Sequence, residues 1–209
     1  TLIESTRQAF KEIKRTLIDG VRYYVIEDKK VSYPSVTSVI SFVNRDKWAA
    51  WQQKVGLAEA NRVRKHSTTR GTALHKVFEV YLQNGDYKSL DAYQKPLIQM
   101  MFNAAKKDID TRLSNVHLQE QTMYSDKICL AGTVDLVCEV DGELAIVDFK
   151  TAKSEKPEEW LEDYFVQLSA YWAMFAEATG EVPKKLVVFL VGEDCSVQIV
   201  ERKNIMNYL

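Results

Sequence analysis

The chain has 209 residues, of which 46% are hydrophobic, 11% aromatic and 27% charged, and its formal net charge at pH 7 is −1. This composition is close to the globular average and argues against a disordered, collagenous or membrane-spanning protein. We expect neither a membrane span nor a signal peptide, because no long apolar run and no short apolar segment behind a basic N-terminus occur. A chain of this length can bury one full core, so a single domain over residues 1–209 is expected.

The first half of the chain is expected to be mainly helical. Hydrophobic periodicity predicts an amphipathic helix over residues 7–19 that ends at Gly20, followed by a small hairpin around Asp28-Lys29. Ser35 is the predicted N-cap of a helix that continues to Val43. Further helices are expected over residues 46–64, about 68–84 and 89–114, the last started or kinked by Pro96.

After Asn115 the apolar residues alternate, which is typical of strands. The expected elements are antiparallel strands over 117–124, 128–140 and 143–149, a helix over 158–179, and strands over 186–191 and 197–201. This order predicts an α/β (α+β) fold with a central mixed β-sheet flanked by helices. A helical N-terminal layer over 1–115 would then accompany a β-rich core over 116–209.

Charge is unevenly distributed along the chain. Residues 1–75 contain 14 Lys and Arg against 7 Asp and Glu, whereas residues 76–209 contain 14 against 22. This asymmetry suggests a basic surface for an anion beside an acidic region that could hold a cation. Lys65 and Arg70 belong to a basic cluster just before His75, although such a cluster can equally be a solvated helical face.

Several cofactor motifs are missing from the sequence. The three cysteines form no CxxC pair and are one short of the usual four-cysteine set, so we expect reduced thiols and no iron–sulfur cluster. The three histidines lack zinc-site spacing. No Walker-type phosphate-binding motif occurs, so we expect no ATP site.

The most informative stretch is the expected hairpin at Asp141-Gly142, the strongest short-range signal for a two-residue turn. If those two residues form the loop, Asp135 lies directly opposite Asp148, with Cβ atoms roughly 5 Å apart. Lys150 points the same way, because strands alternate with period two.

Two carboxylates this close, in partly buried surroundings, repel by roughly 3 kcal/mol at an effective dielectric constant near 20. A divalent cation between them turns repulsion into binding, and oxygen ligands suit Mg²⁺ or Mn²⁺. The alternative is that one aspartate is protonated, or forms a structural salt bridge with Lys150. The chemistry that the metal interpretation supports is phosphodiester hydrolysis.

Four motifs in order resemble a known family. Asp135 within Gly-Thr-Val-Asp-Leu-Val and the run Asp148-Phe149-Lys150-Thr151 resemble the PD-(D/E)XK nuclease superfamily, in its RecB-like branch. Arg-Gly-Thr-Ala-Leu-His, ending at His75, and Gln167-Leu-Ser-Ala-Tyr171 match two further elements of that branch. The resemblance is strongest to stand-alone single-strand exonucleases similar to the mitochondrial genome maintenance exonuclease and its phage-like relatives. It implies a restriction-endonuclease-like core.

The resemblance also implies residue roles. The expected metal ligands are His75, Asp135, Asp148 and the backbone carbonyl of Phe149, and Lys150 would act on the attacking water. The residues expected to contact substrate are Gln167, Tyr171, Arg70, Thr151, Ser35 and Lys65. For Tyr171, packing beneath the sheet is nearly as good an interpretation. Glu79 and Glu120 are expected to support the ligands rather than to bind the metal.

The expected function is therefore a Mg²⁺- or Mn²⁺-dependent DNA exonuclease for single-stranded or flap DNA, used in replication, repair or recombination. Trp48 and Trp51, among basic residues, offer stacking surfaces for a single strand, although tryptophans at this spacing are usually core residues. A separate helicase, polymerase or recombination protein would be a further partner. The expected location is the cytoplasm, of the host if a phage encodes the chain. The alternatives are a structure-specific endonuclease, such as a junction resolvase or restriction-like enzyme, and a non-catalytic nucleic-acid-binding module.

Overall fold

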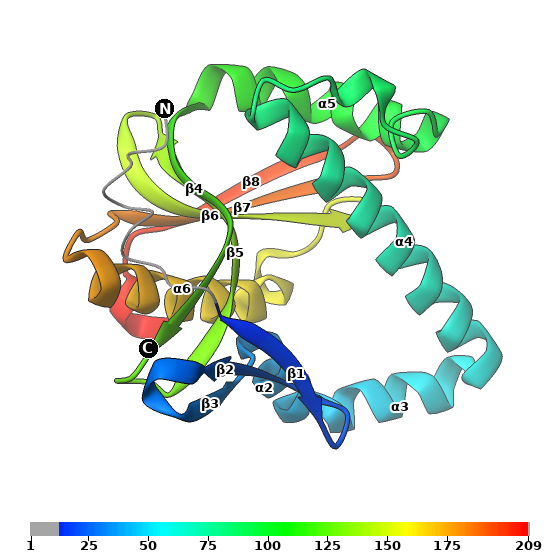
Figure 1. Ribbon diagram of the computed structural model, residues 1–209. Coiled ribbons are helices and arrows are strands. Elements are labelled where there is room, and N and C mark those ends of the chain that lie inside the picture. The colour runs from blue at the N-terminus through cyan, green and yellow to red at the C-terminus, as the bar shows by residue number, and fades with distance from the viewer. Residues whose placement is uncertain (1–12, 209) are drawn as a thin grey trace.

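The computed structural model describes residues 13–208 and contains two β-sheets and a set of helices around them (Figure 1). The larger sheet has the order β4-β5-β6-β7-β8, in which β6 and β7 run parallel and all other neighbours are antiparallel. Its strands are β4 (Leu113–Ser125), β5 (Leu130–Val140), β6 (Glu143–Ala152), β7 (Lys185–Gly192) and β8 (Val197–Arg202). The predicted mixed sheet is confirmed.

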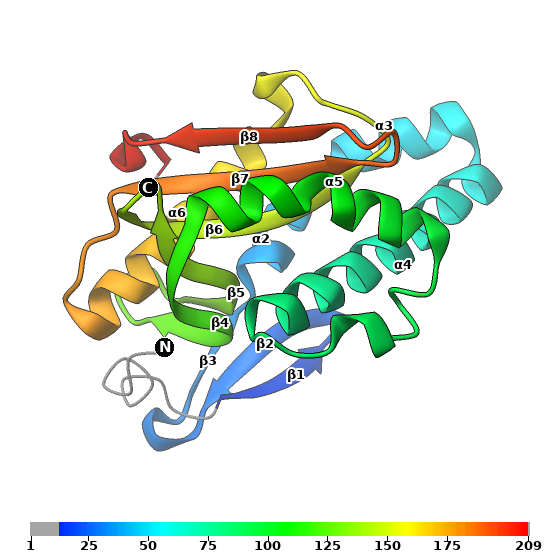
Figure 2. The same ribbon diagram turned by 90° about the horizontal axis from the view of Figure 1, so that it is seen from above.

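Helices cover both faces of this sheet (Figure 2). On one face, α4 (Leu57–Leu82) and α5 (Pro96–Arg112) pack on the apolar side chains of β5, β6 and β7, with Phe78 and Phe102 at the centre. On the other face, α6 (Glu162–Thr179) packs through Phe165 and Leu168 against the alternate side chains. The period-two pattern of each strand therefore supplies both cores.

A smaller antiparallel sheet precedes the helices. It consists of β1 (Lys14–Ile18), β2 (Val21–Ile26) and β3 (Val31–Pro34). Ser35 then caps α2 (Val36–Val43), because its Oγ accepts a hydrogen bond from the N–H of Ser38 at 3.3 Å. The predicted hairpin and the predicted cap are both confirmed. Short 3₁₀ turns lie at Glu27–Lys29, Tyr87–Ser89, Glu158–Trp160 and Ile205–Tyr208.

The helix expected over residues 7–19 is wrong where the structure describes it, because Lys14–Ile18 form strand β1; residues 7–12 lie outside the described residues. Asp19 and Gly20 adopt φ values of 51° and 77° and form a two-residue turn that pairs Ile18 with Val21. Gly20 thus ends a hairpin and not a helix. The Asp-Gly signal is the same one that sets the hairpin at Asp141-Gly142.

The helix boundary expected between residues 64 and 68 is also wrong. The break lies at Gly56, between α3 (Arg45–Val55) and α4, where φ is 85° and ψ is 151°. Only glycine adopts this conformation readily, whereas residues 64–68 contain no helix breaker. One helix of 26 residues therefore carries both the basic cluster and His75. Within residues 13–208, none of the helices has the length and apolar character needed to span a bilayer.

Candidate metal centre and adjoining cavity

The candidate site lies where β5 and β6 separate. Asp141 and Gly142 form the two-residue turn, Val140 pairs with Glu143, and pairing continues to Leu136 and Val147. This is the register that the sequence predicted. The ladder ends one pair before Asp135 and Asp148, so these two aspartates stand at the opening of the fork.

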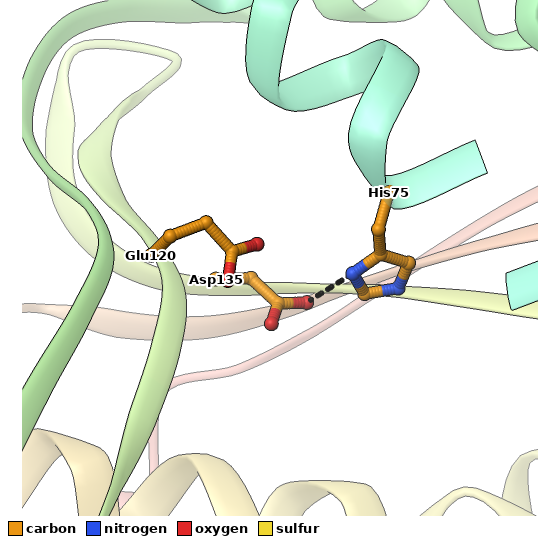
Figure 3. Close-up of side chains that lie close together, drawn as sticks. All are labelled: His75, Glu120 and Asp135. Atoms are coloured by element: carbon orange, nitrogen blue, oxygen red, sulfur yellow. Dashed lines mark ion pairs between the residues drawn. The ribbon is translucent and has the colours of Figure 1, made fainter. Parts of the chain in front are cut away.

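Asp135 faces His75, which projects from α4 (Figure 3). The Asp135 Oδ2 atom accepts a hydrogen bond from the N–H of Phe149 at 3.0 Å and lies 3.5 Å from His75 Nδ1. The other ring nitrogen of His75, Nε2, lies 2.5 Å from the carbonyl oxygen of Phe149. Three of the groups expected to bind metal, His75, Asp135 and the Phe149 carbonyl, are therefore together.

Glu120 joins this group from β4. One ligand atom from each of His75, Glu120 and Asp135 lies within 4.8 Å of the others. The pairs Gln119–Leu136 and Gln121–Val134 place Glu120 across from Asp135, and its φ of 47° interrupts the ladder there. The sequence predicted a supporting role for Glu120, but its position is that of a ligand.

The register that brings Glu120 here could not be predicted from the sequence. The turn between β4 and β5 spans residues 126–129, too long to fix the pairing as Asp-Gly does. Partial burial, and then the nearby charge of Asp135, raise the pKa of Glu120 to about 7, although the residue as a whole is exposed. The cluster thus concentrates negative charge that is costly without a cation.

Asp148 and Lys150 form a second group beside the first. Asp148 is 1% exposed, and its Oδ2 lies 2.6 Å from Lys150 Nζ. Gln167 of α6 contacts both residues: its Nε2 donates to Asp148 Oδ1 at 3.3 Å, and its Oε1 accepts from Lys150 Nζ at 3.4 Å. Asp148 lies outside the three-residue cluster, so the salt bridge that the sequence left open as an alternative is present.

Electrostatics keeps this second group charged in a defined way. Burial, and also the charge of Asp135, raise the pKa of Asp148 against the opposing effect of Lys150. Burial lowers the pKa of Lys150, but the carboxylates of Asp148 and Asp135 outweigh burial, and the net pKa is raised. Lys150 is therefore a cation at neutral pH, a hydrogen-bond donor and not a base.

The donor set fits a divalent metal ion. It offers an imidazole nitrogen and two carboxylates from three different elements, with Asp148 and the Phe149 carbonyl adjacent. Carboxylate and carbonyl oxygens suit Mg²⁺ and Mn²⁺, and the imidazole adds affinity for the softer Mn²⁺. The repulsion that raises the pKa of Glu120 is the physical reason for a cation here.

A cavity of about 700 Å³ adjoins this centre, between α4, the end of β6 and the start of α6. Arg70 and Thr151, two of the expected substrate contacts, line it. Tyr164 connects the cavity to the centre, because it lines the cavity and its ring centroid lies 5.1 Å from Lys150 Nζ. Further lining residues that the sequence did not single out for this role are Arg62, His66, Lys153, Lys156, Trp160 and Glu193.

A second cavity, of about 680 Å³, lies between α3 and α4. Trp48, which is 58% exposed, lines both cavities, and Trp51 lines the second. The two rings meet edge to face with centroids 6.1 Å apart. Trp48 is thus a surface residue, which favours the stacking interpretation over the core interpretation.

The remaining expected substrate contacts lie elsewhere. Lys65 is exposed on α4 but lines neither cavity. Ser35 is buried, and its hydroxyl caps α2. Tyr171 is 2% exposed behind Gln167, whose Nε2 donates to its hydroxyl at 3.3 Å. Gln167 and Tyr171 therefore contact the centre's own residues. Glu79 forms a 2.7 Å ion pair with Lys76, next to Glu120.

Comparisons with known proteins agree with this geometry. The model of the PD-(D/E)XK nuclease superfamily matches residues 47–204, which include every residue of the metal centre. One chain of the ATP-dependent helicase/nuclease of Clostridium botulinum is 28% identical over 56% of this chain. The present chain spans 11% of that relative's length. This similarity agrees with the RecB-like branch.

Among solved structures, the crystal structure of SSO0001 aligns with 78% of this chain and 65% of its own, at 12% identity and a TM-score of 0.37. The match to the family model covers well over half of the chain and carries the assignment. This chain belongs to the PD-(D/E)XK nuclease superfamily, whose members are metal-dependent nucleases.

Proposed function

We propose that the chain is a Mg²⁺- or Mn²⁺-dependent DNA exonuclease that acts on single-stranded or flap DNA. The observation that carries the proposal is the convergence of His75, Glu120 and Asp135 beside the Asp148–Lys150 pair. This set combines metal ligands with a buried cation, and the cavity beside it is lined by basic and aromatic side chains.

Each residue has a role that its surroundings support. His75, Glu120 and Asp135 would hold the cation, with Asp148 and the Phe149 carbonyl close enough to contribute. A bound divalent cation supplies Lewis acidity, which lowers the pKa of water and offsets charge that builds on the phosphate.

Lys150 donates hydrogen bonds from a fixed position, either to the attacking water or to a phosphate oxygen. Gln167 holds Asp148 and Lys150 in their relative orientation through its two contacts.

Preference for a single strand is supported by the cavity wall. Exposed indole and phenol rings next to Lys and Arg side chains are the usual means by which proteins bind unpaired strands without sequence preference. Trp48 and Trp160 are 58% and 68% exposed. Stacking requires bases that are free of pairing, so a duplex cannot use these rings without local melting.

The test uses linear single-stranded, flap, blunt duplex and covalently closed circular single-stranded DNA, each with Mg²⁺, Mn²⁺ or a chelator. We expect cleavage of the linear strand and the flap with either metal and none with the chelator. An intact circle identifies an exonuclease, whereas a cut circle shows the endonuclease alternative. Equal cleavage of blunt duplex and single strand would refute strand selectivity. Binding without cleavage under every condition would point to the non-catalytic module.

A further inference from the structure

Arg70 and Glu193 form an ion pair in the wall of the cavity, close to the proposed catalytic centre. Arg70 is 6% exposed, and its Nη1 donates to Glu193 Oε1. His66, one turn earlier on α4, places Nδ1 3.4 Å from the same oxygen. One carboxylate oxygen thus lies between two side chains that bind anions.

The guanidinium of Arg70 is only partly satisfied by this contact. Its Nε is buried and has no hydrogen-bond partner among the described residues. A guanidinium usually binds a carboxylate or a phosphate through two parallel hydrogen bonds. Here Glu193 is bonded through Nη1 alone, so Arg70 has unused donor capacity in the wall of a cavity.

Backbone contacts hold Glu193 in this position. Its N–H donates to the carbonyl of Ala152 at 3.0 Å, and the N–H of Asp194 donates to the carbonyl of Lys153 at 3.3 Å. The turn between β7 and β8 is thereby fixed to the end of β6. The carboxylate would therefore stay near Arg70 even if another anion took its place on the guanidinium.

The charge of the cavity favours an anion larger than one carboxylate. Arg62, Arg70, Lys153 and Lys156 line it, against two acidic residues, Glu155 and Glu193. Lys153 is exposed, and Lys156 donates to the hydroxyl of Tyr164 at 3.0 Å, which leaves its ammonium with further donors. A phosphate can accept from several of these donors at once.

We infer that Arg70, His66 and the cavity lysines form a phosphate subsite, in which the Glu193 carboxylate takes the place of a phosphate of the nucleic-acid strand. The inference rests on the proposed function for the identity of the strand. Glu193 then competes with the substrate: binding a strand requires the carboxylate to give up Arg70. This competition weakens binding of any single phosphate and eases release of the strand after cleavage.

The test is the direction in which strand affinity changes in E193Q. Binding of a short, internally labelled oligothymidylate is measured by fluorescence anisotropy in chelator, so that no cleavage occurs. If Glu193 competes with phosphate, E193Q should bind about tenfold more tightly than the wild type, because a like charge beside the phosphate is gone. If Glu193 only orients Arg70, E193Q should bind more weakly, and the inference is overturned.

E155Q is the matched control, because Glu155 lines the same cavity, is exposed, and loses the same charge. A change below about twofold is expected there, since exposed charges at a distance are screened. An equal gain in E155Q and E193Q would show a general charge effect and would overturn the subsite. Thermal melting of each variant checks that the fold is kept.

A double variant, R70Q/E193Q, removes both charges and so leaves no unpaired buried charge. It should lose the gain of E193Q; retention of the gain would count against Arg70 as the phosphate ligand. Titration with inorganic phosphate, followed by ³¹P NMR, should show binding to E193Q and none to the double variant. Equal binding to both, or to neither, would contradict the assignment.

The source of the phosphate is separated by comparing oligonucleotides with a 5′-phosphate, a 3′-phosphate or hydroxyls at both ends. A gain confined to one phosphorylated end identifies a terminal phosphate, and a gain for all three identifies an internal diester; both support the subsite. Because these measurements need no catalysis, a chain that cleaves nothing would refute the proposed function while leaving this result readable.

Discussion

Lys150 is a buried ammonium whose position depends on Asp148 and Gln167. We expect K150A to lower the cleavage rate by about 10²–10³-fold or more, the usual effect of losing a donor aimed at developing charge. Strand binding in chelator should change little, because the lysine lies at the centre and not in the wall of the cavity. The measurement is single-turnover cleavage together with anisotropy.

K107A serves as the control for K150A, because Lys107 is exposed on α5 and lines neither cavity. It should cleave at the wild-type rate. Full activity in K150A would remove the role proposed for Lys150.

Glu120 makes metal binding depend on pH. Its pKa is raised to about 7 in the metal-free protein, so between its unfolded pKa and about 7 the folded state binds a proton that the unfolded state has lost. Metal-free stability therefore falls as pH rises through this window. A cation binds the ionised form, so its stabilising effect should grow over the same window.

The measurement is the shift in melting temperature caused by Mg²⁺ or Mn²⁺ at about pH 5.5 and about pH 8, on either side of the raised pKa. The shift should be larger at the higher pH, and E120Q should reduce this difference. A shift that is independent of pH in the wild type would show that Glu120 does not take part.

At the scale of elements, two glycines near the site have opposite requirements. A Cβ on Gly132 of β5 would lie 2.7 Å from the ring of Tyr171, which is buried and cannot move aside. A Cβ on Gly71 of α4 would meet only Thr151 Oγ1, at 3.7 Å. The small residue is therefore required on the strand and not on the helix.

We expect G132A to lower the free energy of unfolding by about 1–3 kcal/mol, as overpacking in a core does. G71A should raise it by about 0.5–1 kcal/mol, because alanine is favoured over glycine within a helix. Urea denaturation of both variants is the measurement. Equal stability of G132A and the wild type would mean that α6 does not press against β5 as described.

The parts of the site that the sequence predicted are those set by local geometry. The turn at Asp141-Gly142 fixes the register of β5 and β6, and from it the positions of Asp135, Asp148 and Lys150 could be predicted. Glu120 and Glu193 depend on longer connections and on packing between distant segments, which no local pattern encodes. The strand at Lys14–Ile18 was missed because Gly20 can end a helix as well as form a hairpin turn.

At the scale of the whole molecule, both halves of the chain supply the basic side chains of the cavity. Arg62 and Arg70 come from the basic first part, and Lys153 and Lys156 from the acidic second part. Division of the sequence by net charge therefore identified only one side of this surface. The fold brings the other side to it by extending β6 past the metal centre.

This surface should make strand binding depend strongly on salt. For a single strand, the logarithm of affinity falls with the logarithm of salt concentration by about 0.7 for each phosphate neutralised. K153A should reduce that slope by about 0.7, whereas K107A should leave it unchanged. The measurement is anisotropy over a series of salt concentrations. Identical slopes for K153A and the wild type would place the strand elsewhere.

The uninterrupted course of α4 has a mechanical consequence. Arg70 and His75 are five residues apart on one rigid helix, so their axial separation is about 7.5 Å, from a rise of 1.5 Å per residue. Grip and cut are then held at a constant offset, in the manner of a ruler. Insertion of a single alanine between them would turn one about 100° relative to the other and put the two out of phase.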